Sequence, residues 1–459
     1  MTVFRTAAAR LIATFLCGVS AAMAAPGPAS AAGAERTTLI RNVTAITLTD
    51  AGTSAGMAVL ISGGRIKTLI RPGSPLPKAD QIIDGSGLYL IPGLIDAHVH
   101  YPYSGLAKPA NYLRYGVTTV FSLGTPEAEL PALLAARDDI SKGRLVGPHL
   151  YATGPAIANQ VRLERPDQVE PFLDKLAAFK FELVKVYNEI PQPVFDAVVV
   201  GARRRGMGVF GHMPRTFPPE YSLTHGLNVL AHMEELFFTV FGGPRDRDLD
   251  KLVPDWTPDY GKIDATLDLF VANQVAIIPN LSASLNFQNL WADEDREFST
   301  SDTAYIKSDV LRAWRETNVA RRPQIAQRMA REQIKYPLLR TLSYRAAKKG
   351  VLLLAGSDAP LAALFPGRSL HQELRLLVAA GLTNEQALRT ATANGGMATR
   401  QWVNRTACIG VIKAGCEADL VLLRANPLDD IRNAAMIAGV MADGRWFTPT
   451  QLETLSRPD

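Results

Sequence analysis

The chain has 459 residues, of which 47% are hydrophobic and 20% charged, fractions that exclude a disordered chain and leave ample sequence to bury a large core. Its 49 Lys and Arg against 44 Asp and Glu give a net charge of +5. This balance is too weak to indicate nucleic acid or a charged membrane surface as a partner. The three cysteines are too few for a disulfide scaffold.

The first 24 residues have the layout of a secretory signal peptide. Two arginines without an acidic residue precede the apolar stretch Leu11–Ala24, which ends in the small-residue motif Ala22–Ala24. The stretch is shorter than the ~20 residues that span a bilayer, so cleavage is favoured over a membrane anchor, and no later stretch qualifies as a span. We therefore expect a periplasmic or secreted chain that begins near Ala25 with a flexible leader over residues 25–37.

Both ends of the mature chain are rich in short apolar segments separated by Gly-Gly, Pro-Gly and Asp-Gly pairs. The strands expected from them are Leu39–Leu48, Ala58–Ile61, Arg65–Ile70, Gln81–Ile83, Gly410–Ile412, Leu420–Leu423 and Ala438–Ala442. Hairpin turns are expected at Ser62–Arg65 and at Asp443-Gly444. The two ends should therefore form one small β-sandwich domain from residues 38–92 and 404–459.

Between these ends, apolar runs alternate with helical patterns such as Glu127–Ser141 and Pro193–Arg205. Eight strands are expected, at Leu94–Ala97, Thr118–Ser122, Leu150–Thr153, Leu183–Val186, Val209–Phe210, Val229–Leu230, Ala276–Pro279 and Leu352–Ala355. Thr383 and Gln386 form a capping box at the start of the last helix. This alternation predicts an α/β fold, a (β/α)8 TIM barrel over residues 93–403.

Residues 287–349 exceed what a minimal barrel needs and read as a helical insertion between the seventh and eighth strands. The segment is rich in aromatic residues: Trp291, Tyr305, Trp314, Tyr336 and Tyr344. Residues 242–260, after the sixth strand, are rich in Asp and Pro and should form a loop. Insertions in barrels emerge beside the active site, which favours a lid over the site. An ordinary packing helix or an oligomer contact is the equal alternative.

Six polar residues stand at the ends of expected strands: His98 and His100 after the first, Lys185 in the fourth, and His212, His232 and Asp358 after the fifth, sixth and eighth. Period-two alternation puts His98 and His100 on one side of their strand. Because the carboxyl ends of barrel strands meet at one rim, we expect all six side chains to converge. Imidazole and carboxylate groups gathered in this way predict a metal site.

These motifs resemble the amidohydrolase superfamily and, within it, the imidazolonepropionase-like and Xaa-Pro-dipeptidase-like branch. The resemblance is carried by the motif Gly93–His100, the later strand-end histidines, Ser357-Asp358, and the segments Tyr115–Thr119, Ala380–Thr383 and Gly410–Leu423. It spans nearly all of residues 38–446. Two places depart from many relatives: Phe121–Gly124 replaces an Arg-Asp pair followed by Gly-Gly, and Met233–Glu235 replaces a Gly-Thr pair. Both lie where substrate would bind.

The resemblance implies two divalent metal ions, expected to be Zn²⁺. His98, His100 and Asp358 would hold the more buried ion, and His212 and His232 the second. Lys185 would carry CO2 as a carbamate that bridges both ions; an unmodified lysine beside a single metal is the alternative. The branch implies hydrolysis of an amide bond by a metal-activated hydroxide, with Asp358 as general base and then general acid.

The substrate class expected is a small molecule, a dipeptide or N-acyl amino acid, and Tyr187 is a possible hydrogen-bond donor to it. A cyclic amide, a lactone or a phosphoester on the same two-metal site is the first alternative, and a catalytically silent binding module is the second. The sequence leaves homo-oligomerisation open. It also leaves open whether Cys408 and Cys416 form a disulfide in the oxidising compartment or remain independent. His149, His225 and His371 are expected to be structural.

Overall fold

The computed structural model describes residues 36–102, 108–245 and 257–458. The expected signal peptide over residues 1–24 and the leader up to residue 35 lie outside the described residues. Among the helices of the described residues, none is long and apolar enough to cross a membrane. The expected domain boundaries at residues 93 and 403 stay predictions.

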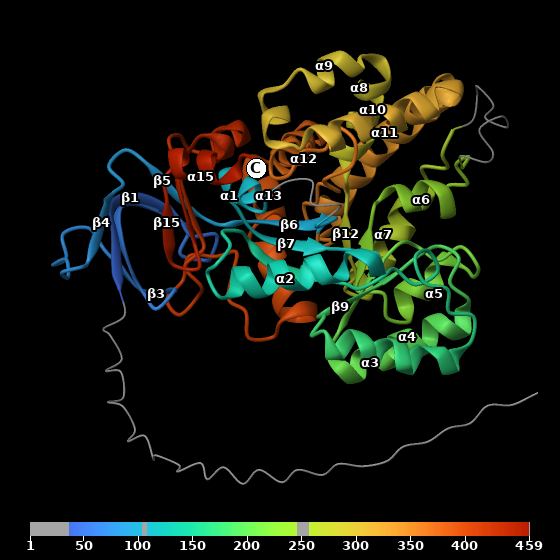
Figure 1. Ribbon diagram of the computed structural model, residues 1–459, viewed down its shortest axis with the longest axis horizontal. Helices are drawn as coiled ribbons and strands as arrows, with labels where there is room; N and C mark the ends of the chain where they lie inside the picture. The colour runs from blue at the N-terminus through green and yellow to red at the C-terminus, as the bar shows by residue number, and fades with distance from the viewer. Residues whose placement is uncertain (1–35, 103–107, 246–256, 459) are drawn as a thin grey trace, which may run out of the picture. The chain divides into compact units, whose positions relative to one another are not determined.

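Strands from both ends of the chain share one eight-stranded mixed sheet, which Figure 1 shows in blue and red. Its order is β15-β14-β13-β5-β1-β2-β3, and β4 also pairs with β1. The bounds are β1 Thr37–Ile46, β2 Thr53–Ser62, β3 Arg65–Ile70, β4 Gln81–Asp84, β5 Tyr89–Pro92, β13 Leu420–Leu423, β14 Ile437–Ala442 and β15 Arg445–Phe447. A core of alternating aliphatic side chains, including Ile40, Val59, Leu90 and Leu420, covers one face.

Both predicted hairpins are present in this sheet. Ser62 pairs with Arg65 between β2 and β3, and Ala442 pairs with Arg445 between β14 and β15. The predicted strand Gly410–Ile412 is wrong, because this segment lies in a loop. Gly410 has φ +77°, and a Cβ atom there would lie 2.3 Å from the Thr392 carbonyl oxygen, so the backbone turns tightly against a helix instead of extending.

The middle of the chain contains two parallel sheets. One has the order β6-β7-β8 and the other β12-β11-β10-β9. Their bounds are β6 Leu94–Val99, β7 Val117–Ser122, β8 His149–Ala152, β9 Leu183–Val186, β10 Gly208–Gly211, β11 Val229–Ala231 and β12 Ala276–Ile278. Most residues of these strands are buried, as expected for parallel strands covered on both faces.

Isolated parallel bridges connect the two sheets. Thr153 pairs with Leu183 and joins the β8 side to β9, while Leu353 pairs with Ile277 of β12 and Ala359 pairs with Val99 of β6. The predicted eighth strand Leu352–Ala355 thus lies between β12 and β6 but is not a regular strand. One reason is that the Ala355 amide donates to the Thr390 carbonyl oxygen and not to a neighbouring strand.

Helices follow most of these strands and pack on their outer side, as Figure 1 shows for α2 to α5. Through the described residues up to the insertion they are α1 Ala110–Arg114, α2 Leu130–Ser141, α3 Val169–Ala178, α4 Gln192–Arg205, α5 Pro219–Thr224, α6 Glu234–Thr239 and α7 Lys262–Ala272. Beyond it they are α12 Arg368–Ala380, α13 Asn384–Thr390, α14 Ala393–Ala398 and α15 Pro449–Ser456. The predicted capping box is confirmed, because Thr383 and Gln386 exchange both hydrogen bonds at the start of α13.

The segment after β12 is mostly helical, as predicted, and begins slightly earlier than residue 287. Its main helices are α8 Leu281–Ala292, α9 Glu294–Phe298, α10 Ser308–Arg321 and α11 Ile325–Lys349. Trp314 of α10 is buried and lies against Phe298 and Phe365, with ring centroids 6.0 and 5.7 Å apart. In the stretch of chain before β13, Cys408 and Cys416 form a disulfide, and their Cα atoms are 4.6 Å apart.

Candidate metal centre

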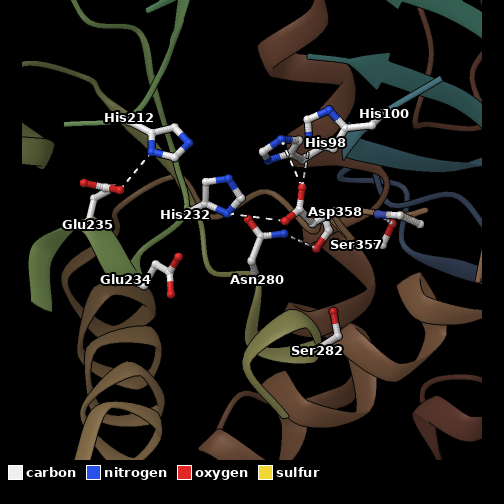
Figure 2. Close-up of polar contacts among 12 residues, drawn as sticks. His98, His100, His212, His232, Glu234, Glu235, Asn280, Ser282, Ser357 and Asp358 are labelled. Carbon is white, nitrogen blue, oxygen red and sulfur yellow. Dashed lines mark hydrogen bonds and ion pairs between the residues drawn. The ribbon is translucent and has the colours of Figure 1, made fainter. Parts of the chain in front are cut away.

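The six predicted side chains lie at the carboxyl ends of the parallel strands. His98 belongs to β6 and Lys185 to β9. His100, His212 and His232 directly follow their strands, and Asp358 comes three residues after the irregular segment Leu352–Ala355. Figure 2 shows His98, His100 and His232 around Asp358, and His212 beyond His232. Parallel strands end at the same edge, which is why residues more than 250 positions apart in the chain meet here.

Asp358 lies at the centre of the cluster. Its Oδ1 atom is 3.0 Å from His100 Nε2 and 3.4 Å from His98 Nε2. Its Oδ2 atom is 4.0 Å from His232 Nδ1. One ligand atom each from His98, His232 and Asp358 lies within 4.8 Å of the others, and all three residues are buried. These three residues therefore lie close enough together to belong to one metal centre.

Lys185 and His212 complete the cluster, the first beside His98 and the second beside His232. The Lys185 ammonium nitrogen is 3.2 Å from His98 Nε2, and the side chain is buried. The His212 ring lies 4.8 Å from that of His232, centroid to centroid. Tyr187, predicted to contact substrate, packs against the His212 ring with centroids 3.8 Å apart and the ring planes tilted by 32°. Tyr187 therefore reaches the cluster by covering one face of an imidazole.

The backbone is strained at two of these positions. Asp358 has φ +61° and His232 has φ +76°, in the left-handed region that residues other than glycine rarely adopt. Gly356 also allows a close approach, since a Cβ atom there would lie 3.0 Å from the His98 Cβ. Such strain persists only where the surrounding structure fixes it, and it occurs preferentially at functional sites.

Burial largely determines the protonation state of the side chains in the cluster. Burial lowers the pKa of His232 to about 4 and that of His98 and His212 well below the ordinary value. All three imidazoles are therefore neutral near pH 7, which is the form that binds metal. Burial also lowers the pKa of Lys185 to about 8. For Asp358, burial acts to raise the pKa, but the neighbouring His232 and His100 lower it below the ordinary value.

A buried carboxylate holds the two strand ends that carry His98 and Asp358. Asp96 accepts hydrogen bonds from the Ser357 amide at 2.9 Å and from the Ser357 hydroxyl at 2.6 Å. It also accepts from the His98 amide at 3.3 Å. Asp96 is fully buried, and burial raises its pKa to about 7. Its contacts fix the chain directly before Asp358 against the chain that carries His98.

A second buried carboxylate, which the sequence did not indicate, lies beside His212. Glu235 accepts a hydrogen bond from His212 Nδ1 at 2.8 Å. The only sequence signal was the departure at Met233–Glu235, where many relatives have Gly-Thr. That departure showed an unusual residue but gave no sign of its partner, because His212 lies 23 positions earlier in the chain.

A cavity of about 570 Å³ adjoins the cluster on the side of His212. Aromatic and charged residues line it: Tyr187, Asn188, Glu189, His212, Arg215, Glu234, Glu235, Phe238, Arg245, Phe287, Trp291, Arg328, Arg331, Glu332 and Lys335. Six of these belong to α8 and α11, so the helical segment forms one wall of the cavity. The predicted insertion therefore contributes to the surroundings of the site.

The remaining histidines have structural contacts. His149 Nε2 lies 3.0 Å from Asp419, and this carboxylate raises the pKa of His149 to about 9. His371 is buried in α12 and its Nε2 bonds the Tyr115 carbonyl at 2.8 Å. His225 ends α5 and stacks on Tyr221 at 3.7 Å. None of the three lies in the cluster.

Comparisons with known proteins agree with this architecture. The sequence profile of the Amidohydrolase family matches residues 341–447. An allantoinase of Escherichia coli (strain SMS-3-5 / SECEC) is 29% identical over 123 residues, which cover 24% of this chain and 26% of the relative. The aligned part thus spans only about a quarter of the curated relative's length.

Solved structures match over nearly the whole chain. Bottromycin amidohydrolase has a TM-score of 0.69 at 22% identity and covers 92% of this chain and 89% of its own. A Xaa-Pro dipeptidase with bound methionine in the active site has a TM-score of 0.65 at 18% identity and covers 90% and 100%. Residues 341–447 of the chain are thus similar to the Amidohydrolase family. The fold of the whole chain is similar to that of these two solved structures.

Proposed function

We propose that the protein is an exported, metal-dependent amidohydrolase that cleaves an amide C–N bond of a dipeptide or an N-acyl amino acid. The observation that carries this proposal is the convergence of four histidines, one lysine and one aspartate at the edge of the parallel strands. We also propose that the parallel strands close into a (β/α)8 barrel. This is supported by the bridges that connect the two parallel sheets through the segment Leu352–Ala355, and by the helices on their outer side.

The residues fit two divalent ions, for which Zn²⁺ is our choice. His98 Nδ1 is buried without a hydrogen-bond partner within the described residues, and the neutral imidazoles and one carboxylate are ligands that zinc prefers. We assign His98, His100 and Asp358 to one ion and His212 and His232 to the other. The buried Lys185, with its pKa lowered to about 8, has more neutral amine to react with CO2 than an exposed lysine, which supports a bridging carbamate.

Such ions supply activation of a water molecule and polarisation of the substrate carbonyl. In this mechanism Asp358 moves the proton. Its Oδ1 atom is occupied by His98 and His100, whereas Oδ2 is 4.0 Å from His232 and is the atom available for transfer. Oδ2 would accept a proton from the attacking water and return it to the leaving nitrogen.

The cavity supports a substrate with a carboxylate and an apolar side chain. Arg215, Arg331 and Lys335 surround the Phe238 ring, with their charged centres 5.2, 5.7 and 5.9 Å from its centroid. Phe287 and Trp291 stack beside each other, 5.9 Å apart. Each of these cations is also paired with a glutamate of the cavity wall. Charges of both signs beside aromatic faces suit a charged dipeptide or N-acyl amino acid better than a neutral cyclic amide or a lactone.

The test is hydrolysis of a substrate panel by protein stripped with a chelator and reloaded with Zn²⁺. We expect turnover of dipeptides or N-acyl amino acids only after reloading, and slower or no turnover of cyclic amides, lactones and phosphoesters. At saturating Zn²⁺, Asp358→Asn should lower turnover by about 10²–10⁴-fold, because the amide cannot carry the proton. Unchanged turnover in this variant would refute the shuttle, and a panel without any turnover would favour a binding module.

Export is part of the proposal and rests on the N-terminal sequence pattern. We expect the exported protein to begin near Ala25. N-terminal sequencing of the protein recovered from the periplasm or medium tests this, and a chain that begins at Met1 would contradict it.

A further inference from the structure

We propose that Glu235 is a positioning residue that aims His212 at the second metal ion and holds together the three strand ends around that ion. This inference rests on the proposed two-ion centre. Many superfamily members have a Gly-Thr pair at this place. The role that we assign to Glu235 is therefore specific to this chain and is not taken from the superfamily.

Three donors surround the Glu235 carboxylate. His212 Nδ1 donates to Oε1 at 2.8 Å, and Asn188 Nδ2 donates to Oε2 at 2.7 Å. Arg215 donates to both oxygens, at 3.1 and 2.9 Å. The Glu235 side chain is only 2% exposed. A carboxylate buried this deeply is unfavourable unless charged and polar donors compensate it, and here both oxygens are compensated.

The donors come from consecutive strand ends. Asn188 follows β9, the strand of Lys185, and His212 and Arg215 follow β10. Glu235 is the second residue of α6, three residues after His232, which follows β11. One carboxylate thus ties together the ends of the three strands that carry Lys185, His212 and His232. These are the residues we assign to the second ion and to the bridge.

The hydrogen bond also fixes the His212 ring. Because Nδ1 donates to Glu235, Nε2 is the nitrogen left to bind a metal. Figure 2 shows Glu235 on one side of His212 and His232 on the other. Tyr187 covers a face of the ring, which restricts its rotation further. The geometry therefore points to a carboxylate–histidine–metal arrangement in which Glu235 is the outer member.

Glu234 is a natural control. It is the adjacent residue in the chain, but it faces Lys335 of α11 instead of a histidine of the cluster. Replacing each glutamate by glutamine makes the same chemical change one position apart. Only the change at Glu235 should alter the metal ligands.

The experiment measures Zn²⁺ binding by equilibrium dialysis with elemental analysis, and the visible spectrum of the Co²⁺-loaded protein. The wild type should bind two ions per chain. Glu235→Gln should keep the first ion and bind the second about 10–100-fold more weakly, with an altered Co²⁺ spectrum. Glu234→Gln should bind both ions as the wild type does.

Wild-type affinity for both ions and an unchanged Co²⁺ spectrum in Glu235→Gln would overturn the inference while leaving the proposed function intact. A wild type that binds fewer than two ions would overturn the two-ion centre, and this inference with it. If Glu235→Gln does not fold by circular dichroism, Asn188→Ala decides, because it removes one support of Glu235 without touching His212. A weaker second ion in that variant supports the inference, and an unchanged one overturns it.

Discussion

Replacing Lys335 by methionine should destabilise the protein strongly, because Lys335 joins the helical segment to the site through buried charges. Its side chain is only 4% exposed, and its ammonium group lies between Glu234 and Glu332. The distance from Lys335 Nζ to Glu332 Oε1 is 2.7 Å. Glu332 is 2% exposed and belongs to the same helix α11, whereas Glu234 follows β11.

The magnitude follows from what the two carboxylates retain. Removing one partner of a buried ion pair costs about 3–5 kcal/mol. Glu332 would keep the Ser284 hydroxyl as donor and Arg331 at 3.5 Å. Glu234 is 35% exposed, so water can solvate it partly. We therefore expect Lys335→Met to lower the free energy of unfolding by about 3 kcal/mol, the lower end of that range.

Urea unfolding followed by circular dichroism measures this change, and an exposed lysine supplies the control. Lys142 pairs with Asp138 at 2.7 Å, but the two side chains are 56% and 48% exposed. Lys142→Met should therefore cost about 0–1 kcal/mol. The reasoning would be refuted if Lys335→Met cost no more than Lys142→Met.

Two further predictions concern Lys185 and His149. Lys185→Ala should lose one of two bound ions and most turnover, and added bicarbonate should aid reconstitution of the wild type; a variant with two ions and normal turnover would contradict the carbamate bridge. Asp419 raises the pKa of His149 to about 9, above its ordinary value of 6.5. Protonated His149 therefore stabilises the fold fully below about pH 6.5, and this contribution disappears as the pH rises through about 9. The free-energy difference between wild type and His149→Gln in urea unfolding should be larger at about pH 6 than at about pH 10, and equal differences would exclude this account.

The strand-end residues could be predicted because each one carries its own local signal. An apolar run followed directly by a histidine, as in Val229–His232, indicates both the strand and the residue at its end. The irregular segment before Asp358 gave the same signal, because its residues are as buried and aliphatic as those of a true strand. What the run could not indicate is that the Ala355 amide bonds the Thr390 carbonyl oxygen. Whether a segment forms the regular backbone hydrogen bonds of a strand depends on segments far away in the sequence. The local pattern of apolar residues carries no information about them.

Partners that lie far apart in the chain were not predictable from the sequence. His149 and Asp419 are separated by 270 positions, and neither lies in a pattern that names the other. Asp96 was visible within the motif Gly93–His100, but its bonds to Ser357 were not. The same holds for Glu235, whose position was noticed as a departure while its role came only from the three donors around it.

The structure also bears on the two interpretations of the helical segment. Phe287 and Trp291 of α8 line the cavity, which a lid would do. However, Lys335 fixes α11 to Glu234, and Trp314 of α10 packs against Phe365, which lies outside the segment. A segment held by buried charges and buried aromatic rings would lose these contacts if it opened. We therefore infer that it acts as a fixed wall of the cavity, so substitutions of Phe287 or Trp291 should change substrate preference, whereas loss of Lys335 should change stability first.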